Sequence, residues 1–397
     1  MRLDELNLRQ KVGNVLFTLL ILVIMIDPPN TVLHMKDLVF VVVVGYNIAF
    51  FKPNWHYLPH IFIVVGCMML SYVLSEMQMN AMDYDVMFGV LKSVAPLILL
   101  LWVGHYDLIK LAILPTLIAC LIQLALFVMA IGNDTFQYAA FLFLKAHNFP
   151  LMMTHRAYFG VTLFMVYYKS QTSFMFATFL CYYWLFKKDT SRGKRFLLLI
   201  AVTILTASFC ISGTRSTMLV PFVLMGVAFY CRIKRTRYAR YAFYPLLGVL
   251  VACFLLVVFL LASDTGETSN MQKYAHLPSY VTHFANHPEY LFIGQGAGTT
   301  FYSLGTQCMV TESEWTYIEV FRRYGLLCLP ILCVIFGPLK QLILNREDDV
   351  AFGILWVYIA YLFVAGTNPL LFSSTGMIMV LMAYCFVEKL KIKNNKQ

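Results

Sequence analysis

Arg215 is the first side chain whose type and position suggest chemistry. It stands in the segment Ser212-Gly-Thr-Arg-Ser216, between two long apolar runs. A guanidinium group can bind two phosphate oxygens at once, and the first backbone amides of a helix add further donors for the same anion. Arg215 is therefore a candidate anion-binding residue. An arginine that snorkels from a membrane interface is an equally good interpretation.

Glu314 is the second candidate, because it stands eleven residues before Gly325. This spacing is about three helical turns, so we expect both residues on one face of a single helix. Arg322 and Arg323 would follow about 12 Å along that helix, at 1.5 Å per residue. A carboxylate base with cations nearby suits an anionic substrate. The alternative is a set of intrahelical ion pairs, since Glu319 precedes the two arginines by three and four residues.

His155 and Arg156 form a third candidate. They belong to Thr154-His-Arg-Ala-Tyr-Phe-Gly160, which we expect to open a helix on the outer side of a membrane. Arg156 would supply a second contact to an anion, and His155 could carry protons. A polar entry to a helix accounts for His155 at least as well.

Nothing in the sequence requires a metal ion or a cofactor. Asp83 and Asp85 form a D-x-D pair of the kind that metal-dependent, lipid-linked glycosyltransferases can use, but two acids at this spacing often arise by chance. The segment Gly294-Gln-Gly-Ala-Gly298 lacks the strand before it and the helix after it that a nucleotide-binding loop needs. We interpret it as flexible backbone near a ligand.

The composition determines which elements must position these residues. Of the 397 residues 60% are hydrophobic and only 13% are charged, and the mean hydropathy is +0.73. A soluble domain carries about 25% charged residues. The composition therefore excludes a soluble enzyme, a disordered protein and a nucleic-acid-binding module, and predicts an all-α, polytopic integral membrane protein.

Apolar runs predict about twelve transmembrane helices in a single transmembrane domain, 1–397. The run at 156–187 is long enough for two thin helices or one tilted helix, and we count it once. The twelve runs lie at 12–26, 37–51, 58–75, 86–104, 107–131, 156–187, 196–212, 217–231, 241–262, 315–338, 351–366 and 375–388.

Basic residues orient these helices. They gather at the N-terminus, at 187–195, at 232–240 and after Glu388, and the net charge is +10. By the positive-inside rule all four patches, and so both termini, are expected in the cytoplasm. The long polar loop 263–313 is then expected on the outer (periplasmic) side, and function tends to lie on loops of this kind.

This combination of features resembles the O-antigen polymerase/ligase superfamily (Wzy- and WaaL-like proteins). The resemblance rests on the S-G-T-R-S turn, the long outer loop with a late G-x-G-x-G, and the polar residue eleven positions before a glycine. A Thr367-Asn-Pro-Leu-Leu-Phe-Ser-Ser374 element before the last helix adds to it. The resemblance covers roughly 150–388.

The resemblance implies an outward-facing, metal-independent glycosyltransferase of GT-C-like architecture in the bacterial inner membrane. Its donor would be an oligosaccharide on undecaprenyl diphosphate, with Arg215 on the diphosphate and Arg156, Arg322 and Arg323 assisting. Ligases of the family carry histidine where this chain has Glu314, so the polymerase is favoured, with Glu314 as the base.

Several partners and rival functions follow from the same resemblance. A chain-length-regulating membrane protein would be a further partner, and nucleic acid would not. The rival functions are an O-antigen ligase that transfers the glycan to lipid A-core, a non-enzymatic flippase or transporter of the lipid-linked unit, and a metal-dependent glycosyltransferase that uses Asp83 and Asp85.

Overall fold

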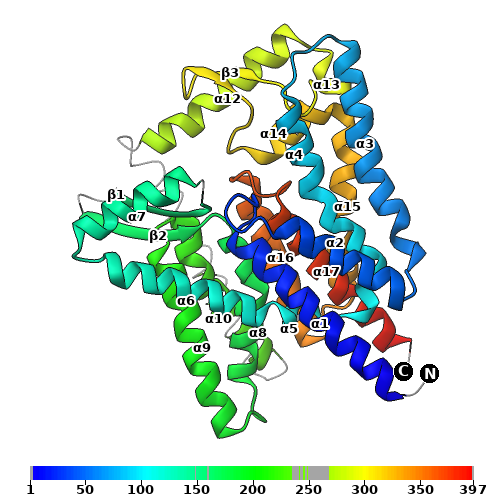
Figure 1. Cartoon of the computed structure of the whole chain (residues 1–397), viewed down its shortest axis with the longest axis vertical. Coiled ribbons are helices and arrows are strands. Elements are labelled where there is room, and N and C mark those ends of the chain that lie inside the picture. Colours follow the sequence, from blue (N-terminus) through cyan, green and yellow to red (C-terminus); the bar gives the residue numbers. More distant parts are fainter. Residues whose placement is uncertain are drawn as a thin grey trace.

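The structure is a computed structural model that describes residues 3–147, 149–158, 161–234, 241, 245, 248 and 268–395. Helices make up most of it, and most of them run between two ends of the molecule (Figure 1). The α-helices are α1 (Leu3–Ile26), α2 (Lys36–Phe50), α3 (Leu58–Met77), α4 (Tyr84–Val94), α5 (Leu108–Leu111), α6 (Ile113–Ala130), α7 (Asp134–Ala146), α8 (Met175–Phe186), α9 (Arg192–Ile211), α10 (Arg215–Ile233), α12 (Thr268–Asn286), α13 (Tyr290–Ile293), α14 (Thr316–Tyr324), α15 (Cys328–Leu344), α16 (Asp349–Gly366) and α17 (Ser374–Asn394). Short 3-10 helices are η1 (Trp55–Tyr57), η2 (Ala95–His105), η3 (Gln171–Phe174) and η4 (Gly325–Leu327).

Seven helical segments of the described chain are long and apolar enough to cross a membrane. This finding agrees with the expected helical membrane protein. Other apolar helices are shorter: α2 has 15 residues and α8 has 12, whereas a span needs about 20. The predicted total of twelve therefore stays a prediction, and most of the run at 241–262 lies outside the described residues. The seven segments are Asn7–Ile26, Trp55–Met77, Tyr84–His105, Leu108–Ala130, Arg192–Ile211, Thr316–Leu344 and Asp349–Gly366.

The expectation of helix from residue 156 onward is wrong. Strand β1 (Leu151–Tyr158) pairs antiparallel with β2 (Val161–Tyr168), and helix returns only at η3 and α8. Aromatic and β-branched side chains dominate β2, and such residues favour strands. Pairing also satisfies the polar groups of both backbones, as an apolar setting demands. His155 and Arg156 thus lie on a strand and open no helix.

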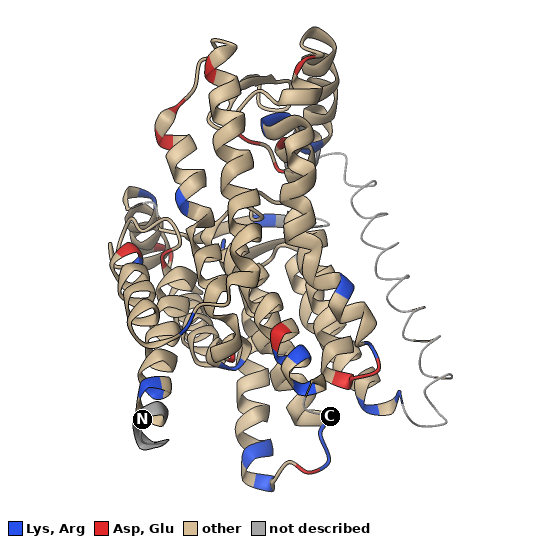
Figure 2. Ribbon diagram, turned by 90° about the vertical axis from the view of Figure 1, so that its right-hand side faces the viewer, with Lys and Arg blue, Asp and Glu red and all other residues tan. Residues whose placement is uncertain are grey.

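Both termini lie at one end of the molecule, close together in Figure 1. Figure 2 shows many lysines and arginines gathered around the same end. Ion pairs connect the basic ends of different helices there: Lys389 Nζ lies 2.7 Å from Asp107, and Lys234 Nζ lies 3.0 Å from Asp349. We call this the basic end. The arrangement agrees with termini on one side of a membrane.

The opposite end holds a folded cap. It consists of α12, α13, α14 and a second small sheet, in which β3 (Phe301–Ser303) pairs with β4 (Cys308–Val310) (Figure 1). Most of the predicted outer loop is therefore regular structure, although residues 263–267 lie outside the described part of the chain. The described chain is mostly helical, as expected, and its two small sheets are additions to that helical architecture.

Candidate functional site

A cavity of about 590 Å³ lies where the α1–α2 loop, the β1–β2 sheet, the start of α10 and the start of α17 meet. The size falls in the range of small-molecule sites, about 300–1,000 Å³. Most of its lining side chains are polar or proline. The lining comprises Pro28, Pro29, Ser93, Pro150, Met152, Tyr167, Tyr168, Lys169, Ser170, Gln171, Thr172, Thr214, Thr217, Glu312, Val364, Asn368, Pro369, Leu370, Ser373, Ser374 and Thr375.

The Ser212–Ser216 turn forms one wall of this cavity. Gly213 has a φ of 61°, and a Cβ atom there would overlap the Met165 side chain, so only glycine fits the turn. Thr214 and Thr217 line the cavity, and their hydroxyl groups are hydrogen-bonded to each other. Arg215 begins α10 between these two threonines. The Arg215 side chain itself lies outside the described residues.

The Thr367–Ser374 element, far along the chain from the turn, lines the same cavity. Ser373 caps α17, because its Oγ accepts a hydrogen bond from the Gly376 amide at 3.0 Å. Ser373, Ser374 and Thr375 all line the cavity. Two long helices, α10 and α17, therefore begin at one cavity, and a helix N-terminus favours a negatively charged group. The exposed Lys169 adds a cation to the wall.

Glu314 is not where the spacing predicts it. Helix α14 begins at Thr316, and Gly325 ends it with a φ of 52°, so Glu314 lies before the helix and shares no helical face with Gly325. Its Oε2 atom is 2.6 Å from Lys273 Nζ. Glu314 is not among the cavity residues, but Glu312 is. The sequence contains both glutamates, and only Glu314 has the eleven-residue spacing to Gly325 on which its prediction rests.

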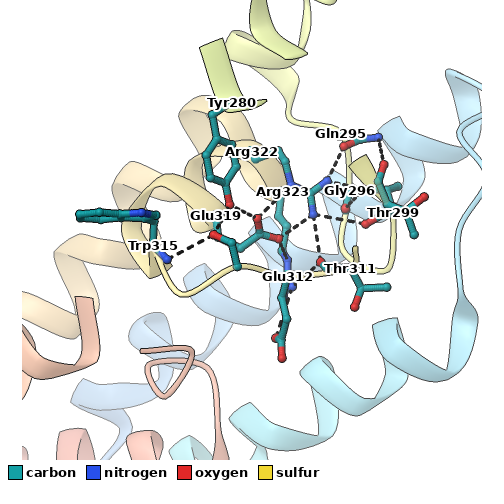
Figure 3. A network of polar contacts seen from close by, with 12 residues as sticks. Tyr280, Gln295, Gly296, Thr299, Thr311, Glu312, Trp315, Glu319, Arg322 and Arg323 are labelled. Atoms are coloured by element: carbon teal, nitrogen blue, oxygen red, sulfur yellow. Dashed lines mark hydrogen bonds and ion pairs between the residues drawn. The ribbon is translucent and has the colours of Figure 1, made fainter. Parts of the chain in front are cut away.

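Arg322 and Glu319 form the centre of a buried polar network (Figure 3). The Arg322 side chain is fully buried, and its Nε and Nη2 atoms donate to Glu319 at 3.0 and 2.6 Å. Its Nη1 donates to Thr299 at 3.0 Å and to Gln295, and the guanidinium lies 4.8 Å from the centre of the Phe301 ring. The intrahelical ion pair, the alternative interpretation of this segment, is thus present, and Arg322 holds the cap together.

Arg323 connects this network to the cavity. Its Nε donates to Glu319 at 2.7 Å, and its Nη2 donates to the Thr311 carbonyl at 2.9 Å. The same Nη2 lies 3.6 Å from the carboxylate of Glu312, whose side chain is 56% exposed. Arg323 therefore links the buried network to a residue of the cavity lining, although Arg323 does not line the cavity itself.

The glycine segment 294–298 supports the backbone of α14. Gly294, Gly296 and Gly298 all have positive φ values, and a Cβ atom on Gly294 would overlap the Arg323 carbonyl. The amides of Gln295 and Gly296 donate to the carbonyls of Arg322 and Arg323 at 2.8 and 2.9 Å. None of the residues 294–298 lines the cavity. The geometry therefore supports a structural role for this glycine segment and does not support the expected role near a ligand.

The remaining candidates lie elsewhere. His155 lines a separate hollow of about 410 Å³ between α7 and the β1–β2 sheet, and Arg156 lines neither cavity. Asp83 caps α4, since its Oδ1 accepts the amides of Asp85 and Val86 at 3.0 and 3.2 Å. Within the described ranges no three His, Cys, Asp or Glu side chains are grouped closely enough to hold a metal ion.

Comparison with known proteins does not assign this chain to a family or a function. No protein-family model matches the sequence, and a search of the curated proteins finds no match. The residues and the cavity alone carry the functional argument.

Proposed function

We propose that this protein polymerises undecaprenyl-diphosphate-linked repeat units of O-antigen or a related surface polysaccharide. The observation that carries the proposal is the cavity, because the two segments that look polymerase-like, Ser212–Ser216 and Thr367–Ser374, both contribute residues to its lining. They are far apart in the sequence. Their meeting at one cavity is what a shared substrate site requires.

The diphosphate of the donor occupies this cavity in our proposal. The N-termini of α10 and α17 supply backbone donors, and Lys169 supplies a positive charge. Arg215 is the first residue of α10, and in this proposal it adds a guanidinium to the same phosphate. As the glycosidic bond to the diphosphate breaks, negative charge grows on the leaving group, and these donors stabilise it.

Glu312 is our candidate general base, since it is the one carboxylate among the described residues that line the cavity. A hydroxyl oxygen of the incoming repeat attacks the anomeric carbon of the growing chain and forms the new C–O bond. The bond from that carbon to the diphosphate breaks, and undecaprenyl diphosphate leaves with the electron pair. The hydroxyl proton passes to Glu312. Backside attack of this kind inverts the anomeric centre.

The proposal also includes an orientation of the protein in the membrane. The basic end faces the cytoplasm, and the cap with α12 and α14 faces the periplasm. The protein thus acts at the outer face of the inner membrane, where lipid-linked repeats are available after their export.

The test is polymerisation by purified protein in nanodiscs, with a lipid-linked single repeat as the only substrate. Arg215→Ala and Glu312→Gln should each slow elongation by roughly 100-fold or more. Arg232→Ala, which changes an arginine in the last turn of α10 at the basic end, is the matched control for the first variant. Glu314→Gln is the matched control for the second.

The controls decide the assignment. Elongation at the normal rate in Arg215→Ala or Glu312→Gln would remove these residues from the mechanism. Loss of elongation in Glu314→Gln, with normal elongation in Glu312→Gln, would identify Glu314 as the general base instead of Glu312. Protein that binds the lipid-linked repeat but never elongates it would favour the flippase or ligase alternatives.

A further inference from the structure

Lys36 is a buried cation directly behind the wall of the cavity. It is the first residue of α2 and only 8% exposed. Its ammonium group donates to the Ser374 hydroxyl at 3.3 Å and to the Pro28 carbonyl. Ser374 and Pro28 both line the cavity. The charge therefore lies one residue away from the space where a ligand would bind.

The acids nearest to Lys36 in the sequence are engaged elsewhere. Asp37 forms an ion pair with Lys92. Asp27 is fully buried and accepts hydrogen bonds from the backbone amides of 31–33, at distances between 2.7 and 3.0 Å. Among the described residues no carboxylate forms an ion pair with Lys36. Both of its acceptors are neutral.

Such a charge is expensive in the apolar part of a protein. A buried ammonium group loses its hydration, and neutral acceptors replace only part of that energy. The cavity wall has two further incomplete groups: within the described chain the Tyr168 hydroxyl and the Gln171 Oε1 atom are buried and lack hydrogen-bond partners. Tyr168 and Gln171 both line the cavity and are 1% and 3% exposed. A negatively charged ligand would compensate the lysine charge and accept from the Tyr168 hydroxyl, and a hydroxyl group of the same ligand would donate to Gln171 Oε1.

We propose that Lys36 positions the second phosphate of a diphosphate in this cavity, acting through Ser374 at the N-terminus of α17. The proposal rests on the proposed function, which places the diphosphate there. The α10 wall then takes one phosphate and the α17 wall takes the other.

The chemistry of Ser374 explains why the lysine need not touch the ligand. The Ser374 oxygen accepts a hydrogen bond from the Lys36 ammonium group, so its own O–H remains available to donate to a phosphate oxygen. The ammonium charge lies one hydroxyl farther away, about 6–8 Å from the phosphate. At an effective dielectric of about 20 this interaction corresponds to an affinity change of roughly 30- to 100-fold.

The test is equilibrium binding to the purified full chain in nanodiscs. Inorganic pyrophosphate and undecaprenyl diphosphate are the two probes. Lys36→Met keeps the length of the side chain and removes its charge, and Lys36→Arg keeps the charge. Lys110→Met is the control, because Lys110 is an exposed lysine at the basic end whose partner Asp107 also pairs with Lys389.

We expect Lys36→Met to weaken binding of the diphosphate by roughly 30- to 100-fold, Lys36→Arg to retain most of it, and Lys110→Met to leave it unchanged. Ser374→Ala should weaken binding by several-fold, which keeps the proposal testable if Lys36→Met does not fold.

Either of two results would overturn the proposal: unchanged affinity in Lys36→Met, or an equal loss in Lys110→Met. Binding of undecaprenyl diphosphate that does not depend on Lys36 would refute this inference about Lys36 but would not refute the proposed function. Lys36-dependent binding without any polymerisation would retain the site and refute the proposed function. Lys36-dependent binding of pyrophosphate alone would assign the site to the free anion, and binding of the lipid would assign it to the headgroup.

Discussion

Glu319→Gln is the substitution with the largest predicted effect on stability. The Glu319 side chain is 5% exposed and accepts from the Nε and Nη2 atoms of Arg322, from Nε of Arg323 and from the Tyr280 hydroxyl, the last at 2.6 Å. Glutamine has nearly the same shape. It removes the one negative charge that these contacts place between the two buried arginines.

The size of the effect follows from the burial. Removing one partner of a buried ion pair costs about 3–5 kcal/mol, because the remaining charge is left without compensation. The Arg322 and Arg323 side chains are 0% and 7% exposed, so water cannot replace Glu319. We therefore expect Glu319→Gln to lower the free energy of unfolding by about 3–5 kcal/mol.

Unfolding by sodium dodecyl sulfate titration, followed by tryptophan fluorescence, measures this change. Glu314→Gln is the matched control in the same cap, since Glu314 pairs with Lys273 at side-chain exposures of 44% and 32%. An exposed pair contributes about 0–1 kcal/mol. Equal small effects of the two substitutions would refute the argument that the network holds the cap.

Three further predictions concern the turn, the pH dependence and the topology. Gly213→Ala should destabilise the protein by about 1–3 kcal/mol in the same assay, since its φ is 61° and Met165 occupies the space of a Cβ atom. Burial and then Arg322 lower the pKa of His283 to about 4; the unfolded state therefore binds the extra proton first, and stability should fall as the pH drops from about 6.5 to 4, with a smaller slope in His283→Asn. Cys308 is exposed in the cap, so a single-cysteine variant should react with a membrane-impermeant maleimide in intact spheroplasts, whereas a cysteine added after Lys393 should react only after lysis.

The sequence predicts the helical membrane architecture because hydrophobic length is a strong signal. The sequence also predicts the ion pair between Glu319 and Arg322, since residues three apart on a helix are neighbours. It cannot show that the Ser212 turn and Ser374 meet at one cavity, because that contact depends on how α10 and α17 pack.

Two expectations about local structure are wrong, each for its own reason. An apolar run of aromatic and β-branched residues fits a strand or a helix, and β2 pairs with β1 because a partner strand is available next to it. Glu314 is displaced from the cavity because α14 starts two residues later than a continuous helix would, and Glu312 lines the cavity instead. Lys36 gives no signal in the sequence, because only its burial behind Ser374 distinguishes it from any other lysine at a helix start.

The most direct test of the central claim is a polysaccharide gel of the native strain after deletion of this gene. A polymerase account predicts core carrying a single repeat and no ladder, because export and ligation continue without elongation. Core without any repeat would contradict it and would indicate ligation or export as the lost step. An unchanged ladder would show that the protein has no role in the synthesis of this polysaccharide.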